Sequence, residues 1–136
     1  MEKIRVDVDW CDKNFGASLV DYAGNSIVVT AKTYEQLQHE VENALHEQIK
    51  WLIEDGDNVP GWFKNGKYEL DYKLTTAALL RTCESYAPLA VISRATGINQ
   101  HLLSHYANGM KKPRLQQRQR IVDGLHQIGE KLITLV

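Results

Sequence analysis

The stretch ATGINQHLLSHYANGMKKP, residues 95–113, decides how the second half of the chain folds. Gly97 interrupts the apolar pattern and can take the positive φ that a sharp turn between two helices demands. Asn99 is a good N-cap for the next helix, and Ile98 can anchor the turn in the core. Residues 89–108 therefore meet the physical requirements of a helix-turn-helix.

The helix after this turn has two chemically different sides. The apolar side holds Leu102, Leu103 and Tyr106. The other side carries hydrogen-bonding groups with little charge, at Gln100, His101, Ser104 and His105. In a major groove Gln can pair with adenine and His can donate to guanine. We therefore expect these four positions to read DNA base edges, although a polar helix face is often only solvated.

Basic residues follow this helix directly. Residues 99–122 contain five basic side chains and no acidic one. The first three are Lys111, Lys112 and Arg114, and the other two are Arg118 and Arg120. Cations beside a reading helix contact phosphates and fix its register on the duplex. The sequence thus predicts that the polar helix reads the bases and the basic segment holds the backbone.

Two more helices are expected before the turn. Residues 76–86 have helical spacing of apolar side chains, at Leu79, Leu80, Cys83 and Tyr86. Pro88 suits the first turn of a second helix, since its φ is fixed and its missing N–H costs nothing there. That helix should bury Leu89 and Ile92, and the small Ser93 should let the two helices cross closely.

The last segment repeats apolar residues every four and three positions, which is heptad spacing. The members are Ile121, Leu125, Ile128, Leu132 and Leu135. Two heptads are too short for an autonomous coiled coil, and Gly124 and Gly129 weaken them. We expect Ile121 and Leu125 to close the helical core and residues 132–136 to pair subunits. A homodimer or higher homo-oligomer would let the helix-turn-helix read two half-sites.

The first half of the chain alternates apolar and polar residues, which predicts strands. Residues 4–10 place Ile4, Val6, Val8 and Trp10 on one face. Residues 15–20 and 26–31 follow, with DYAGN as a tight turn between them. Three strands so closely spaced should form an antiparallel meander.

The period then changes to that of a helix. Thr33 and Gln36 resemble a capping box, and a helix should run from about Tyr34 to Glu54. Its buried face is expected to hold Leu37, Val41, Leu45, Ile49 and Leu52. KYELDYKL, residues 67–74, predicts a fourth strand. The expected fold class is α+β, with a β-β-β-α-β sheet in residues 1–74 and an all-α helix-turn-helix domain in residues 75–136.

Charge divides the chain at the same place. Residues 1–74 hold 8 Lys and Arg against 14 Asp and Glu, a net charge of −6. Residues 75–136 hold 8 against 3, a net charge of +5. This asymmetry suggests an acidic module joined to a basic one, each with its own partner. The alternative is chance variation along a nearly neutral chain.

Bulk composition narrows the class of protein. The chain is 43% hydrophobic and 24% charged, as folded soluble proteins are. Its longest apolar runs are too short to span a bilayer, and no signal peptide is recognisable. Cys11 and Cys83 form no CxxC motif and no disulfide framework. We expect a reduced, cytoplasmic protein.

Two groups of residues allow a metal interpretation. Asp7 and Asp9 could be carboxylate ligands of a ribonuclease H-like sheet, but metal-dependent phosphoryl chemistry needs several converging carboxylates. The alternative is a solvated strand face. The helix also carries His39, Glu42 and His46, and the reading helix carries His101 and His105. The first set has no HExxH motif, and both of its histidines lie on the polar stripe of the helix. The second set has no third ligand nearby. With no GxSxG, P-loop or dinucleotide fingerprint, no catalytic residue, metal or cofactor is expected.

The segment GINQHLLSHYANGMKKP closely resembles the helix-turn-helix of Cro/C1-type repressors. The first half, with GDNVPGWFKNGKYELDYKL, is similar to the HicB antitoxin family, in which a degenerate ribonuclease H-like sheet precedes a DNA-binding domain. The resemblance spans nearly the whole chain. By position it implies base reading by Gln100, His101, Ser104 and His105 and phosphate contacts by Lys111, Lys112 and Arg114. Leu102 departs from the pattern, since many of these repressors have a small polar residue there.

The resemblance implies a bacterial type II antitoxin. Its N-terminal module would block a small basic ribonuclease toxin of the HicA type, and its C-terminal module would bind double-stranded operator DNA and repress the operon. Two alternatives remain. One is a free-standing repressor whose N-terminal sheet serves oligomerisation or ligand sensing. The other is a nuclease that keeps metal-dependent activity through Asp7 and Asp9.

Overall fold

The computed structural model describes all of residues 1–136 and divides them into two compact units, Met1–Thr75 and Thr76–Val136. The chain is α+β, with one four-stranded mixed sheet and six helices. The sheet belongs to the first unit and four of the helices to the second. None of the helices combines the length and hydropathy that crossing a membrane requires.

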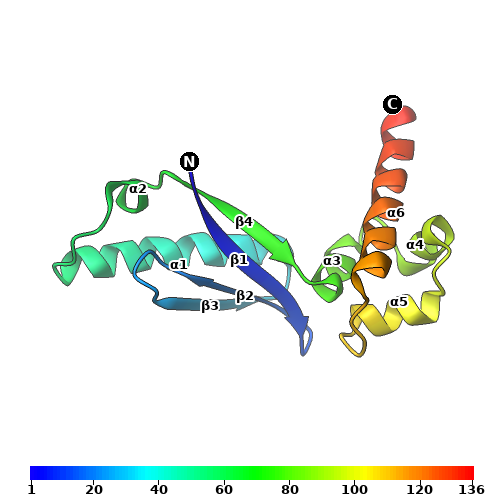
Figure 1. The fold of residues 1–136 in the computed structure, drawn as a ribbon, viewed down its shortest axis with the longest axis horizontal. Helices are drawn as coiled ribbons and strands as arrows, with labels where there is room; N and C mark the ends of the chain where they lie inside the picture. Colours follow the sequence, from blue (N-terminus) through cyan, green and yellow to red (C-terminus); the bar gives the residue numbers. More distant parts are fainter. The chain divides into compact units, whose positions relative to one another are not determined.

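The first unit contains six elements (Figure 1). They are β1 (Glu2–Cys11), β2 (Asn14–Val20), β3 (Ser26–Ala31), α1 (Tyr34–Glu54), α2 (Gly61–Lys64) and β4 (Tyr68–Leu74). The strand order is β3-β2-β1-β4, in which β1 to β3 form the predicted antiparallel meander. β4 pairs parallel to β1, because α1 carries the chain back across the sheet. The short α2 was not expected from the sequence.

The core of this unit lies between α1 and one face of the sheet (Figure 1). Ile4, Val6 and Val8 are buried as predicted, whereas Trp10 at the end of β1 is only half-buried. The expected apolar face of α1 is also buried, at Leu37, Val41, Leu45, Ile49 and Leu52. At the start of α1, the Thr33 hydroxyl accepts from the Gln36 N–H at 3.1 Å, which confirms the predicted N-cap.

Two turns of the first unit have different chemistry. Between β1 and β2, Asp12 and Lys13 both have positive φ, 52° and 66°. This conformation suits a two-residue hairpin, although a lysine adopts it at a cost. Between β2 and β3, Asp21 is buried, with only 6% of the residue exposed. It accepts hydrogen bonds from the backbone and side chain of Asn25, the Ala23 N–H and the Gln48 amide.

The second unit consists of four helices. They are α3 (Thr76–Cys83), α4 (Leu89–Thr96), α5 (Gln100–Ala107) and α6 (Leu115–Thr134). Their shared core contains Leu80, Ala87, Ile92, Ile98, Leu103, Tyr106, Ala107 and Ile121. The sequence wrongly extended the first of these helices to Tyr86. α3 ends at Cys83, and Tyr86 lies outside it with 77% of its surface exposed, so Ala87 fills the core instead.

The turn between α4 and α5 is built as predicted. Gly97 has φ of 75°, and its N–H donates to the Ser93 carbonyl oxygen at 2.8 Å. Ile98 is 3% exposed, and the Asn99 side chain accepts from the His101 N–H at 2.8 Å. Ser93 has a further part in the turn, since its hydroxyl donates to the Ile98 carbonyl oxygen at 2.6 Å.

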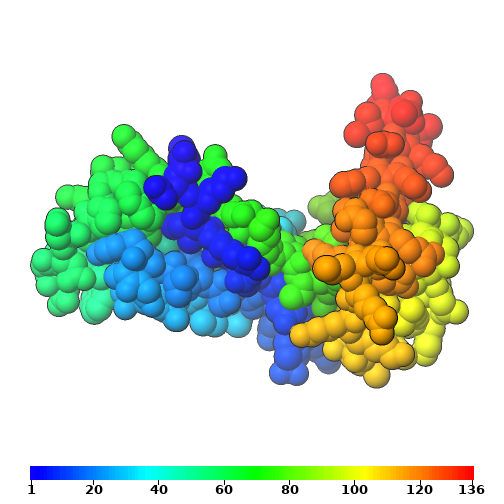
Figure 2. Space-filling view, in the orientation of Figure 1, coloured from blue at the N-terminus to red at the C-terminus, as the bar shows by residue number.

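α6 crosses α4 at very short range. A Cβ on Gly124 would lie 2.4 Å from Cγ2 of Thr96, so only glycine fits at that position. From the sequence, Gly124 was considered only for its effect on the heptad seam; in the structure it is also the point at which α6 approaches α4. Leu125 and Ile128 then pack against the core, and residues 132–136 are exposed at the projecting end of α6 (Figure 2).

Candidate nucleic-acid interface

The side of α5 that faces away from the core carries the four residues expected to read DNA. Gln100 and His101 are exposed, and Ser104 and His105 are half-buried at the edge of this side. The rings of His101 and His105 lie 4.5 Å apart between centroids, one helical turn from each other. We call these four residues the outward side of α5. It offers amide, imidazole and hydroxyl groups to solvent and no carboxylate.

α5 ends in a tight turn that leads to the basic residues. Gly109 has φ of 73°, and its N–H donates to the Tyr106 carbonyl oxygen at 3.1 Å. The Met110 N–H donates to the His105 carbonyl oxygen at 2.9 Å. This pair of hydrogen bonds is a Schellman motif, which satisfies the last carbonyls of a helix and reverses the chain. Lys111 therefore begins a segment that leaves α5 at a defined position.

The expected phosphate-contacting residues are free to meet a ligand. Lys111, Lys112 and Arg114 are all exposed, and we call them the basic segment. With Tyr106 they line a shallow hollow between α5 and the start of α6. The basic segment leads into the positive N-terminal end of α6, whose first turn has no acidic residue. Cations beside the positive ends of helices favour the binding of anions such as phosphate.

Arg118 and Arg120, the other two basic residues expected near phosphates, make contacts within the helical unit, unlike the basic segment. Arg118 donates to the Thr76 hydroxyl at 2.9 Å. Arg120 donates to the Thr96 carbonyl oxygen at 2.8 Å and to the Gln117 amide oxygen at 3.1 Å. Both guanidinium groups thus tie α6 to other parts of the helical unit, because α6 packs with this side of its first turns near α3 and α4.

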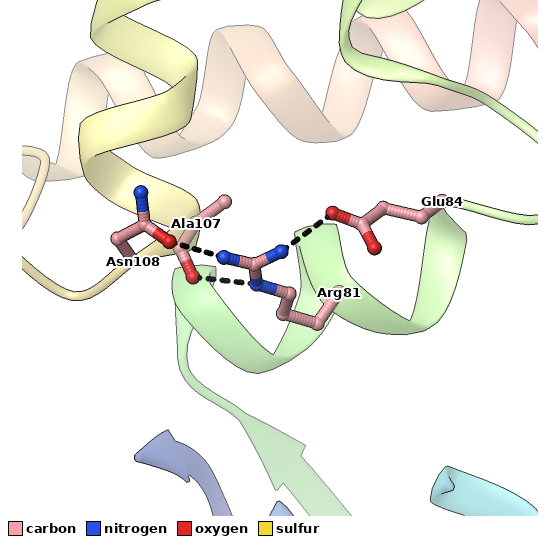
Figure 3. A network of polar contacts seen from close by, with 4 residues as sticks. All are labelled: Arg81, Glu84, Ala107 and Asn108. Atoms are coloured by element: carbon pink, nitrogen blue, oxygen red, sulfur yellow. Dashed lines mark hydrogen bonds and ion pairs between the residues drawn. The ribbon is translucent and has the colours of Figure 1, made fainter. Parts of the chain in front are cut away.

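Arg81 on α3 holds the C-terminal end of α5, and no sequence pattern identified it (Figure 3). Its Nε donates to the Ala107 carbonyl oxygen at 3.0 Å, and a second nitrogen donates to the Asn108 side chain. A third contact joins the guanidinium to Glu84 at 2.8 Å. The planar fork of an arginine can satisfy several acceptors at once. Arg81 therefore fixes the point from which the basic segment starts.

The metal interpretations of the first unit gain no support from the geometry. Asp7 pairs with Arg5 at 2.9 Å, and Asp9 accepts from the Thr75 hydroxyl at 2.8 Å. Both aspartates are exposed on the strand, as are His39, Glu42 and His46 on α1. No three His, Cys, Asp or Glu side chains are placed to share a metal ion.

The candidate interface thus consists of the outward side of α5, the basic segment and the Arg81 contacts that position both. All three belong to the helical unit, Thr76–Val136. No protein family model, curated protein or solved structure matches the chain.

Proposed function

We propose that this chain is an antitoxin of the HicB type. Its helical unit would bind operator DNA as a Cro/C1-type helix-turn-helix and repress its own operon. Its sheet-containing unit, as a partial ribonuclease H-like domain, would neutralise a HicA-like ribonuclease toxin. The observation that carries the proposal is the outward side of α5, followed directly by the exposed basic segment.

The DNA-binding part is supported by the chemistry of the helical unit. The amide of Gln100 and the imidazoles of His101 and His105 can hydrogen-bond to base edges in a major groove. The three cations of the basic segment can contact phosphates on the flanking backbone. From Tyr86 to Val122 the chain has no carboxylate, so this surface attracts a polyanion.

Dimerisation of the helical unit would complete operator recognition. α6 continues past its last core contact and exposes Leu132, Ile133 and Leu135, by 57%, 72% and 81%. These side chains are apolar and uncharged, so two copies can pair without electrostatic repulsion. A twofold dimer would present two outward sides of α5 to half-sites about one helical turn, roughly 34–36 Å, apart.

The toxin-blocking part is supported by charge and by the order of elements. The first half of the chain carries a net charge of −6, which suits a basic toxin. Apart from the short α2, its elements follow the order β-β-β-α-β, with α1 in the crossover to β4, and this order is compatible with the ribonuclease H-like proposal. Retained nuclease activity has less support, because Asp7 and Asp9 are engaged with other side chains.

One observation favours a free-standing repressor instead. Val20 and Val28 are 54% and 70% exposed on the face of the sheet opposite α1. An uncovered apolar patch of this kind could serve oligomerisation or ligand sensing without any toxin.

Co-expression with the neighbouring genes separates the two functions. As an antitoxin, the full chain should co-purify with a small basic protein encoded beside it and relieve the growth arrest that this protein causes. It should also repress a reporter driven by its own promoter. Repression without a co-purified basic partner would favour the free-standing repressor. If the chain neither represses the reporter nor co-purifies with a basic partner, both proposed functions are contradicted.

A further inference from the structure

Trp51 is a large aromatic side chain on a face of α1 that nothing in its unit covers. It is 54% exposed, whereas its neighbour Leu52 is 1% exposed. The residue lies in the last two turns of the 21-residue helix. Tryptophan, with tyrosine and arginine, is enriched at the energetic centres of protein–protein interfaces. An exposed tryptophan on a stable helix is therefore a candidate anchor for a partner.

Carboxylates surround this indole ring at helical spacing. Glu47 lies four residues before Trp51 and Glu54 three residues after it, so all three share one face of α1. Asp55 follows as the C-cap residue. The three carboxylates are exposed, and none of them takes part in the ion pairs of the chain.

This charge pattern is unfavourable for the helix itself. The C-terminal end of a helix carries partial negative charge and is stabilised by nearby cations. α1 has no basic residue in its last turn, and Asp57 adds another exposed carboxylate just beyond the C-cap. Lys50, exposed between Glu47 and Glu54 on the helix, offsets part of this charge. A cationic partner would offset the rest.

We propose that Glu47, Trp51, Glu54 and Asp55 form a docking surface for a cationic protein, with an arginine of the partner lying on the indole ring. Arginine stacks on tryptophan through its planar guanidinium, and the flanking carboxylates can accept its N–H groups. The inference rests on the proposed function, under which this partner is the toxin. It adds the surface that the toxin occupies.

The test measures the affinity of the full chain for the small basic protein encoded beside its gene, used as the probe. Trp51→Ala should raise the Kd at least about tenfold, as loss of an interface anchor does. Trp51→Phe should lose less affinity than Trp51→Ala, because phenylalanine keeps an aromatic face. The pair Glu47→Lys and Glu54→Lys should weaken binding further and reduce its dependence on salt. Val28→Ala and Glu69→Lys, both exposed on the face of the sheet opposite α1, are the matched controls and should bind normally.

Each other outcome overturns a defined statement. If the unchanged chain fails to bind the basic protein, the antitoxin function itself is wrong, and this docking surface falls with it. If the unchanged chain binds and Trp51→Ala binds equally well, only the docking surface is wrong. If only Val28→Ala or Glu69→Lys loses affinity for the basic protein, the binding site lies on the sheet and not on α1. The unchanged chain and Trp51→Ala are also compared in gel filtration without the basic protein. If the variant elutes at a different size, Trp51 contacts a second copy of this chain and the proposal is contradicted. Urea unfolding of each variant shows that it is folded.

Discussion

Gly124 of α6 lies so close to Thr96 of α4 that an added Cβ would come within 2.4 Å of the threonine Cγ2. Gly124→Ala should therefore force the two helices apart and lower the free energy of unfolding by about 1–3 kcal/mol. Gly129→Ala is the matched control on the same helix, where a Cβ meets nothing within 4 Å. It should raise stability by about 0.5–1 kcal/mol, because alanine is the better helix former.

A second substitution tests the cause of this effect. Thr96→Ser removes Cγ2 and keeps the hydroxyl, which donates to the Ile92 carbonyl oxygen and accepts from the Ile98 N–H. Adding Thr96→Ser to Gly124→Ala should restore most of the lost stability in urea unfolding. An additive loss in the double variant would show that the close contact does not cause the destabilisation.

Arg81→Ala should weaken both the helical unit and its binding to operator DNA. The substitution leaves the Ala107 carbonyl oxygen and the Asn108 side chain without their donor, at a cost of about 1–3 kcal/mol. Arg94→Ala removes the same charge from an exposed position on α4 and is the control. Urea midpoints and operator affinity measured together check the prediction. If Arg81→Ala and Arg94→Ala have the same urea midpoint and the same operator affinity, Arg81 does not position α5.

Lys13→Gly should stabilise the β1–β2 hairpin. Lys13 has φ of 66°, a left-handed conformation that costs a non-glycine residue roughly 1–2 kcal/mol. After allowance for the greater freedom of glycine in the unfolded chain, a gain of about 0.5–1 kcal/mol is expected. Lys32→Gly, at an exposed position without positive φ, should destabilise instead. Thermal or urea unfolding of both variants measures whether the stability rises for Lys13→Gly and falls for Lys32→Gly. A loss of stability in Lys13→Gly would contradict the prediction.

Asp21 should make the stability of the first unit depend on pH. Burial by itself raises the pKa of this carboxyl, but hydrogen bonds from Asn25, Gln48 and Ala23 outweigh burial and lower it below its ordinary value. A carboxyl with a lowered folded pKa contributes stability above its unfolded pKa, near 3.9, and loses that stability as pH falls through its folded pKa. Asp21→Asn should cost about 2 kcal/mol at pH 7.

The pH profile of that cost is the informative measurement. Urea unfolding of the unchanged chain and of Asp21→Asn should differ most near neutral pH. The difference should shrink as the pH falls below 4, because protonated Asp21 also loses its charge-assisted hydrogen bonds. A difference that stays constant down to pH 3 would contradict the assigned role of the carboxylate.

The parts of the fold that the sequence predicted depend on local chemistry. Alternation identified β1, helical spacing identified α1, and the N-caps at Thr33 and Asn99 and the turn at Gly97 are set by residues close in the chain. The left-handed conformation of Asp12 and Lys13 was not predicted, because neither residue is glycine. Local sequence signals therefore predicted the regular helices and strands well and the unusual turn poorly.

The remaining features depend on contacts between distant segments. Arg81 meets a carbonyl 26 residues away, and Arg118 and Arg120 meet partners 42 and 24 residues away. No spacing rule connects such positions, so the intramolecular contacts of Arg118 and Arg120 and the role of Arg81 were not predicted. The packing role of Gly124 was not predicted for the same reason, since it depends on the close approach to Thr96. The outward side of α5 was predictable because it follows from helical periodicity alone.

Affinity for the chain's own promoter DNA, compared with a scrambled duplex across a salt series, tests the central claim most directly. Gln100→Ala and His105→Ala should each lose about 1–3 kcal/mol on the promoter and little on the scrambled duplex, because they remove base contacts. Lys111→Ala should weaken binding to both duplexes and flatten the salt dependence, because it removes a phosphate contact. Equal losses on both duplexes for Gln100→Ala and His105→Ala, or no binding of the unchanged chain at low salt, would contradict DNA recognition by α5.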